Sequence, residues 1–358
     1  MNQKEKELFL ELCAFRNPNA KKLDGLLNNG AATPEVLGTL FANRMAGVAY
    51  HVLKETELLD RVDREFRNSL RDTSLLYKKF NYDYLGCIKF LSTELEACGV
   101  PYALLKGAYL CHRYPEGCRV SNDIDVLIAP EDVGKVSVRL KMAGFKQGYL
   151  KNGVFIPATR QQIIESKMTR GETVPFVKEI KLPFVKFLEV DLNFSLDYKN
   201  SNDDTLKRML SNTRLVSVES AKIRTLDKND FILHLCAHLY KEATTVPWIR
   251  MKRDMTFYKY ADLYLMLGEL DQTESRDLVS VAGHMKLQKE LAYCLTSLDS
   301  FYGIENNVLI DYLKTIKKAE LGIVFAPSEK KEYYYIEQNP QKRFFSKNRM
   351  TLLREVLE

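Results

Sequence analysis

The sequence predicts an α+β fold in which a central mixed or antiparallel sheet is flanked by helical regions at both ends of the chain. Apolar residues recur at helical spacing over residues 1 to about 98, beginning with Leu8, Phe9, Leu12 and Phe15. Short apolar and β-branched runs, broken by Gly and Pro, then fill residues 145 to 196. Helical patterns return from about residue 203. With 358 residues, 46% of them apolar, the chain is long enough to bury more than one core.

The composition argues against several classes of protein. No segment approaches 18 consecutive apolar residues and the N-terminus lacks a signal-peptide pattern, so we expect a cytoplasmic protein without membrane spans. The seven cysteines are odd in number, scattered and without a CxxC pair, which disfavours a disulfide framework or a zinc ribbon. A net charge of +6 suits a phosphate-bearing ligand but does not require nucleic acid.

The elements follow in order from local patterns. Thr33 and Pro34 predict a helix start, with Thr as cap and Pro in the first turn. A second helical pattern includes Tyr84 and Ile88. From residue 100 the chain predicts a strand, a short helix, a polar loop and a strand at 123–130. A helix over 131–143 follows and ends at a glycine.

The segment 145–196 is interpreted as antiparallel strands that extend the sheet. Beyond it, helices are predicted over 229–243 with Asp227 as cap, over 257–270 and over 287–298. The predicted division of the chain has four parts: an N-terminal helical region (1–98), a catalytic core (99–200), a C-terminal helical domain (201–320) and a basic, aromatic tail (321–358).

Asp123 and Asp125 are the first candidate site. On a strand their side chains point to the same face, with Cα atoms about 6.6 Å apart, and can share divalent ions. An acid-x-acid pair alone is weak evidence, because it recurs in this chain, for example at Glu94 and Glu96. The strand context and the Lys106-Gly107 turn one helix upstream single this pair out, since glycine lets backbone N–H groups approach a phosphate.

A third acid is expected from residues 187–194. Their strict alternation puts Glu189, Asp191 and Asn193 on one face of a strand, with Asp191 preferred and Glu189 as its competitor. A strand that neighbours Asp123 and Asp125 would complete a three-carboxylate cluster. Two Mg²⁺ ions about 3.5–4 Å apart can be held by such hard oxygen ligands and can stabilise a leaving pyrophosphate.

Residues 104–145, LLKGAYLCHRYPEGCRVSNDIDVLIAPEDVGKVSVRLKMAGF, resemble the bacterial uncharacterised nucleotidyltransferase family of the DNA polymerase β-like superfamily. A later Asp-Leu pair at 191–192 also matches. The resemblance implies a polymerase β-like core in which Asp123 and Asp125 ligate two Mg²⁺ or Mn²⁺ ions. It also implies that Asp191 ligates one of them and acts as base toward the acceptor. The residues it implies at the nucleoside triphosphate are Lys106, Gly107, Ala108, Arg119 and Ser121.

Two positions depart from the pattern. Ala108 stands where the superfamily usually has Ser or Gly, which removes a hydroxyl contact to phosphate. Asn193 stands where the family commonly has His, which bears on how the acceptor is handled.

The expected function is Mg²⁺-dependent transfer of a nucleoside monophosphate from an NTP to a hydroxyl acceptor, with release of pyrophosphate. The acceptor is left open among a small molecule, a peptide, a protein and RNA, as are the base preference and the oligomeric state. The alternative is a catalytically weak or inactive regulatory protein that binds nucleotide or RNA.

Two further patterns are weighed against this function. The segment 329–349 interleaves basic and aromatic residues and could bind RNA, but surface packing or partial disorder is the favoured interpretation. His234 and His238 have zinc-compatible spacing, but Leu235 stands where a metalloprotease has Glu, so helix packing is expected.

Overall fold

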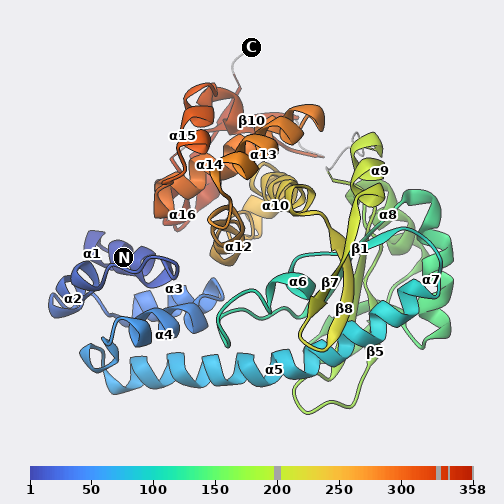
Figure 1. Cartoon of the computed structure of the whole chain (residues 1–358), viewed down its shortest axis with the longest axis horizontal. Coiled ribbons are helices and arrows are strands. Elements are labelled where there is room, and N and C mark those ends of the chain that lie inside the picture. The colour runs from blue at the N-terminus through green and yellow to red at the C-terminus, as the bar shows by residue number, and fades with distance from the viewer. Residues whose placement is uncertain (197–202, 328–331, 338, 357–358) are drawn as a thin grey trace. The chain divides into compact units, whose positions relative to one another are not determined.

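A computed structural model describes residues 1–196, 203–327, 332–337 and 339–356 (Figure 1). The chain divides into two compact units, one formed by residues 1–72 with 232–358 and the other by residues 73–231. The predicted α+β class, with a mixed sheet and helices on either side of it in the chain, is confirmed. The four-part division stays a prediction.

Helices occupy the N-terminal region, as the apolar spacing predicted. Thr33 caps its helix as expected, because its side chain accepts a hydrogen bond from the Val36 backbone N–H and Pro34 follows it. Among the described helices, including the long α5 (Arg64–Glu96), none is long and apolar enough to cross a membrane. The elements are α1 (Gln3–Cys13), α2 (Ala20–Asn28), α3 (Pro34–Ala42), α4 (Ala46–Glu55), the 3-10 turn η1 (Leu59–Arg61) and α5 (Arg64–Glu96).

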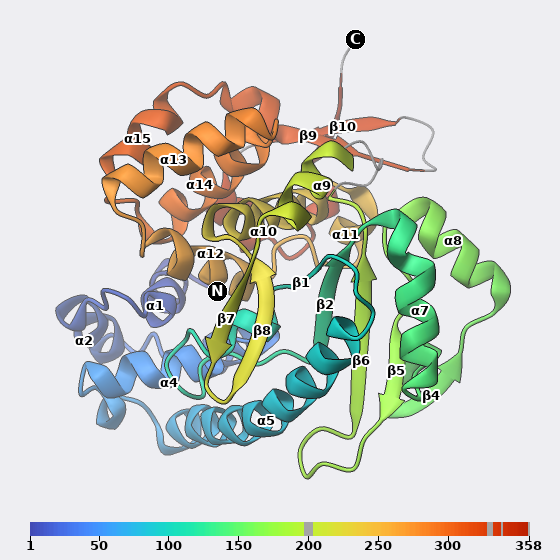
Figure 2. The same cartoon turned by 45° about the vertical axis from the view of Figure 1, so that its right-hand side comes forward.

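A six-stranded sheet forms the centre of the unit 73–231, in the order β1-β2-β6-β5-β3-β4. Figure 2 shows β2 and β6 side by side. The strands are β1 (Tyr102–Leu104), β2 (Asp123–Ile128), β3 (Lys146–Lys151), β4 (Val154–Pro157), β5 (Phe176–Glu179) and β6 (Phe187–Asn193). Between them lie α6 (Gly107–Leu110), the turn η2 (Pro130–Asp132), α7 (Val133–Met142) and α8 (Arg160–Arg170).

The strands expected over 145–196 form and pair antiparallel with one another, but the segment differs from the expectation in two respects. β6 pairs with β2 in parallel and with β5 antiparallel, so the sheet is mixed. Residues 160–170 form helix α8, which begins with a reciprocal capping box between Thr159 and Gln162 and ends at Gly171 in the left-handed conformation. These cap residues stabilise a helix even though the segment carries few apolar residues.

A β-hairpin was also missed in the segment after residue 203. Helix α9 (Asp203–Ser211) is followed by β7 (Thr213–Val218) and β8 (Ala221–Leu226), which pair antiparallel. Alternating burial along β8 is typical of a strand with one buried face. The hydroxyl of Thr225 in β8 donates to the carbonyl of Leu104 in β1 at 2.7 Å, which ties the hairpin to the central sheet.

The helices predicted over 229–243, 257–270 and 287–298 are confirmed. The Phe231 backbone N–H donates to the Asp227 carbonyl at 2.8 Å, so α10 begins where the cap was expected. The C-terminal helices are α10 (Lys228–Ala243), α11 (Val246–Arg250), α12 (Phe257–Leu267), α13 (Gln272–His284), α14 (Gln288–Tyr302), α15 (Asn307–Lys314) and the turn η3 (Lys318–Gly322). All seven cysteines are free and buried.

The described residues of the basic, aromatic segment pack into the unit 1–72 and 232–358, some of them buried and others exposed, and residues 329–331 and 338 lie outside the described residues. The RNA-binding alternative stays a prediction. Phe344 is 5% exposed, and its ring lies 5.1 Å from that of Phe257. The elements are β9 (Ile323–Phe325), β10 (Tyr333–Ile336) and β11 (Leu353–Glu355), which form a three-stranded sheet, with α16 (Pro340–Phe344) and the turn η4 (Arg349–Leu352).

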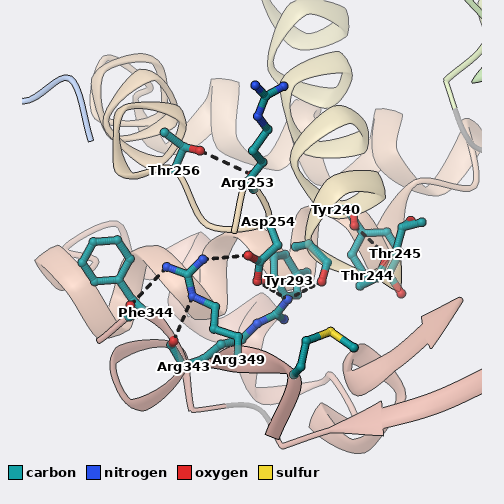
Figure 3. A network of polar contacts seen from close by, with 12 residues as sticks. Tyr240, Thr244, Thr245, Arg253, Asp254, Thr256, Tyr293, Arg343, Phe344 and Arg349 are labelled. Carbon is teal, nitrogen blue, oxygen red and sulfur yellow. Dashed lines mark hydrogen bonds and ion pairs between the residues drawn. The ribbon is translucent and has the colours of Figure 1, made fainter. Parts of the chain in front are cut away.

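A buried ion cluster anchors this C-terminal segment (Figure 3). Asp254 is fully buried and accepts hydrogen bonds from Arg343 at 2.9 Å and from Arg349 at 2.7 Å. Arg343 also donates to the Ala243 carbonyl. Because each buried charge has an opposite partner, the cluster fixes α16 and η4 against the loop that carries Asp254.

Candidate active site

Two parallel strands bring the predicted acids together. In the β2–β6 register Asp123 lies opposite Glu189, and Asp125 lies opposite Asp191. Side chains at paired positions of neighbouring strands point to the same face of the sheet. The structure therefore places all four carboxylates on one face, at the start of β2 and along the middle of β6.

Asp125 is the most buried of the predicted metal ligands, at 7% exposure. Its Oδ1 atom accepts two hydrogen bonds, one from Lys106 Nζ at 2.7 Å and one from Asn193 Nδ2 at 3.2 Å. The Asn193 amide also donates to the Asp191 carbonyl at 3.2 Å. Asn193, noted only as a departure from the family pattern, thus holds both Asp125 and the strand that carries Asp191.

Asp123 is held from two sides. Ser121 Oγ donates to its carboxylate at 3.1 Å, and the Tyr84 hydroxyl donates to its backbone carbonyl at 2.6 Å. Asn81, which lies on α5 as Tyr84 does, donates to the Arg119 carbonyl at 2.7 Å. No role was predicted for Asn81 or for the Tyr84 hydroxyl. The available signal was a polar tip on a face of α5 predicted to be buried, since such a group requires a partner.

The turn between β1 and α6 carries Lys106, which contacts Asp125. Lys106 has φ +44° and ψ −118°, a backbone conformation that L-residues rarely adopt. The Leu105 N–H donates to the Asp125 carbonyl at 3.0 Å and the Ala108 N–H to the Leu105 carbonyl at 3.1 Å. Lys106 and Ser121 therefore contact the acids, whereas Ala108 is fully buried within the turn.

Arg119, predicted to contact the triphosphate, is buried at 3% exposure and its guanidinium donates to the Val120 carbonyl. This contact gives it a part in holding the loop that leads into β2. Its role toward the nucleotide stays a prediction.

Gly107 is required by close packing. A Cβ atom at this position would lie 2.2 Å from Ser121 Cβ and 2.3 Å from Ser121 Oγ. Gly107→Ala is therefore expected to lower the free energy of unfolding by about 1–3 kcal/mol, because the loop must shift to relieve the overlap. Urea unfolding of the purified variant measures this change.

The matched control is Gly134→Ala in α7, where an added Cβ has nothing within 4 Å. It is expected to be neutral or to stabilise the protein by about 0.5–1 kcal/mol. A second substitution, Ser121→Gly, should restore part of the stability that Gly107→Ala removes. If Gly107→Ala unfolds at the same urea concentration as the unchanged protein, the packing argument is wrong.

Negative charge is crowded on this face of the sheet. Burial raises the pKa of Asp191 well above its usual range, and repulsion from Asp125 and Asp123 raises it further. Burial also raises the pKa of Glu189, with Asp123 as the second cause. A divalent cation would relieve this repulsion, and carboxylate oxygens are the ligands that Mg²⁺ and Mn²⁺ prefer, so the donor set fits such an ion.

The side chains do not stand as a ready-made metal cage. Across the described part of the chain, no three His, Cys, Asp or Glu side chains are grouped to hold a metal ion. At Asp125 the Lys106 ammonium contacts the Oδ1 oxygen. His234 is buried and His238 lies 3.7 Å from Glu242, a contact between neighbouring turns of α10.

The raised pKa of Asp191 predicts a pH dependence of stability in the absence of metal. The folded state holds this proton more tightly than the unfolded state, so unfolding becomes easier as pH rises from about 4, near the ordinary value of 3.8, through the raised value. Asp191→Asn should flatten this decline and be more stable than the unchanged protein at pH 7. Urea unfolding in EDTA across this range tests it, and a less stable variant at pH 7 would contradict it.

Comparison with known proteins identifies the family of the chain that carries this site. The family model described as "Uncharacterised nucleotidyltransferase" matches residues 30–303. The chain belongs to this family. The match covers every candidate residue of the site, and the resemblance drawn from residues 104–145 is confirmed.

Other comparisons add little to the family assignment. A crystal structure of an antigenic nucleotidyltransferase-like protein from Paracoccidioides brasiliensis shares 15% identity, covering 56% of this chain and 89% of that one. Its TM-score of 0.34 is too low to carry an argument. No functionally curated protein matches the sequence.

Proposed function

We propose that this member of the nucleotidyltransferase family transfers a nucleoside monophosphate from an NTP to a hydroxyl acceptor and releases pyrophosphate. The observation that carries the proposal is the parallel register that sets Asp125 opposite Asp191, two residues along β2 from Asp123. Nucleotidyl transfer needs several carboxylates that converge on divalent cations, and this register supplies them on one face.

Asp123 and Asp125 would hold two divalent ions, and Asp191 one of them. When bound, Mg²⁺ or Mn²⁺ supplies charge neutralisation for the triphosphate and lowers the pKa of the acceptor hydroxyl. Ser121 orients the Asp123 carboxylate, and Asn193 orients Asp125. Lys106 would meet the phosphates, since its ammonium already lies beside the acids.

Asp191 is the proposed base. Its carboxylate lies on the same sheet face as Asp123 and Asp125, so it can take the proton of an acceptor hydroxyl held beside the metal ions. The acceptor oxygen forms a bond to the α-phosphorus, the bond from that phosphorus to the bridging oxygen of the β-phosphate breaks, and pyrophosphate leaves with both bonding electrons. The hydroxyl proton passes to an Asp191 carboxylate oxygen. Glu189 is the competing candidate because it lies opposite Asp123.

The first experiment incubates the purified protein with Mg²⁺ and each of the four NTPs, with a host-cell extract as the source of acceptors. Pyrophosphate release and transfer of a nucleotide label are followed together, and the double variant Asp123→Ala/Asp125→Ala serves as control. Transfer that disappears in the variant supports the proposal. Equal signals in both proteins would come from the extract and would remove it.

The second candidate function is a nucleotide-binding regulatory protein without catalysis. The contacts of Lys106 and Asn193 with a single Asp125 oxygen favour it, because they leave that oxygen satisfied without metal. Measurable nucleotide binding with no pyrophosphate release from any NTP and any acceptor fraction would support this function over transfer. The acceptor class is left open, and we place the activity in the cytoplasm.

A further inference from the structure

We propose that Lys106 is an exchangeable internal counter-ion, which competes with the divalent cation for Asp125 and moves to the triphosphate when the cation binds. The inference deepens the proposed function and rests on it for the identity of the incoming ligand. It assigns to Lys106 a control of metal affinity in addition to the expected contact with the nucleotide.

The backbone conformation of Lys106 is the first observation that supports this proposal. Its φ of +44° is strained for a residue with a side chain, and glycine is the residue that tolerates such a conformation. The Lys106 side chain keeps 19% of its surface exposed, and its ammonium is directed to Asp125. A strained lysine at a turn where glycine would fit indicates that its ammonium is needed.

The second observation is what the ammonium contacts. Lys106 Nζ lies 2.7 Å from Asp125 Oδ1, and the two side chains are 19% and 9% exposed. Asp125 stands among Asp123, Asp191 and Glu189 on the same face. In this setting the ammonium offsets one of several negative charges that would otherwise repel one another.

The third observation is that the ion pair can be broken without leaving a buried lysine. The ammonium is on a flexible four-carbon stem, and its side chain is twice as exposed as that of Asp125. A doubly charged cation offers Asp125 a stronger partner than an ammonium does. The released ammonium would then pair with the phosphates, so charge stays balanced at each stage.

The test measures Mn²⁺ affinity by electron paramagnetic resonance in the absence of nucleotide. Lys106→Met removes the competing charge and should bind Mn²⁺ about tenfold more tightly than the unchanged protein. Lys106→Arg keeps a positive charge and should stay close to it. The control is Lys78→Met, which removes an exposed lysine paired with Glu116 at 2.7 Å in the same unit and should leave Mn²⁺ affinity unchanged.

A second measurement follows the nucleotide. With Mn²⁺ saturating, Lys106→Met should bind NTP about tenfold more weakly, because the ammonium that would meet the phosphates is absent. The expected result for Lys106→Met is therefore a higher affinity for Mn²⁺ together with a lower affinity for NTP. Mn²⁺ affinity that is unchanged or reduced in a folded Lys106→Met protein overturns the inference.

Folding of the variants is checked by circular dichroism and thermal unfolding. If Lys106→Met does not fold, Lys106→Gly takes its place, since it removes the charge and also relieves the backbone strain. The two proposals fail separately. If the unchanged protein transfers label but Lys106→Met has the same Mn²⁺ affinity, only the counter-ion proposal is wrong. If Lys106→Met has the expected higher Mn²⁺ affinity but no NTP supports transfer, only the catalytic proposal is wrong.

Discussion

Asp125→Asn is expected to lower the rate of nucleotidyl transfer by about a thousandfold or more. The change removes the charge of the most buried predicted metal ligand while keeping its shape. An asparagine oxygen can still accept from Lys106 and Asn193, so the strand pairing should persist. Initial rates of pyrophosphate release and label transfer measure the effect, and thermal unfolding verifies the fold.

The control for this variant is Glu131→Gln. Glu131 is an exposed carboxylate in the turn η2, which follows the end of β2 opposite to Asp123. Its rate should stay within about twofold of the unchanged protein, as for a surface substitution away from the site. An Asp125→Asn protein that retains full transfer would eliminate the carboxylate face as the catalytic centre.

Asp254→Asn is expected to lower the free energy of unfolding by about 3–5 kcal/mol, because it leaves two arginines without their buried counter-charge. Arg343 is 3% exposed, and two of its nitrogens, Nε and Nη1, have no hydrogen-bond partner even in the intact cluster (Figure 3). The neutral amide keeps the size of the side chain but cannot offset the positive charges. Urea unfolding followed by circular dichroism measures the loss.

Asp311→Asn provides the comparison. Asp311 pairs with Lys314 at 2.8 Å, and both side chains are about 70% exposed. Exposed pairs of this kind contribute between about 0 and 1 kcal/mol, so this variant should unfold almost as the unchanged protein does. Equal losses in the two variants would show that burial of the Asp254 cluster does not determine its contribution.

Local patterns predicted the parts of the site that are local. The alternation in residues 187–194 predicted that Glu189, Asp191 and Asn193 share a face, and β6 has this alternation of burial. The Asp-x-Asp strand was predicted in the same way. The direction of β6 relative to β2 could not be predicted, because the same alternation fits parallel and antiparallel partners.

Long-range contacts account for what the sequence did not indicate. Asn81 and Tyr84 reach the site from a helix about 40 residues upstream. Apolar spacing predicted that helix but carries no information about which loop its polar groups meet. The C-terminal sheet was missed for a related reason, since Arg343 and Arg349 look like surface charges until Asp254 is found beside them.

The hydrogen bonds from α5 to the loop before β2 and to the first residue of β2 determine where the boundaries of an expressed fragment can lie. A fragment of residues 99–200 would lack Tyr84 and Asn81, and would leave the carbonyls of Asp123 and Arg119 without their donors. It would also lack Thr225, which bonds to Leu104. All of these contacts lie inside the compact unit 73–231, so the boundaries of an expressed fragment are better drawn there than around the Asp-x-Asp strand.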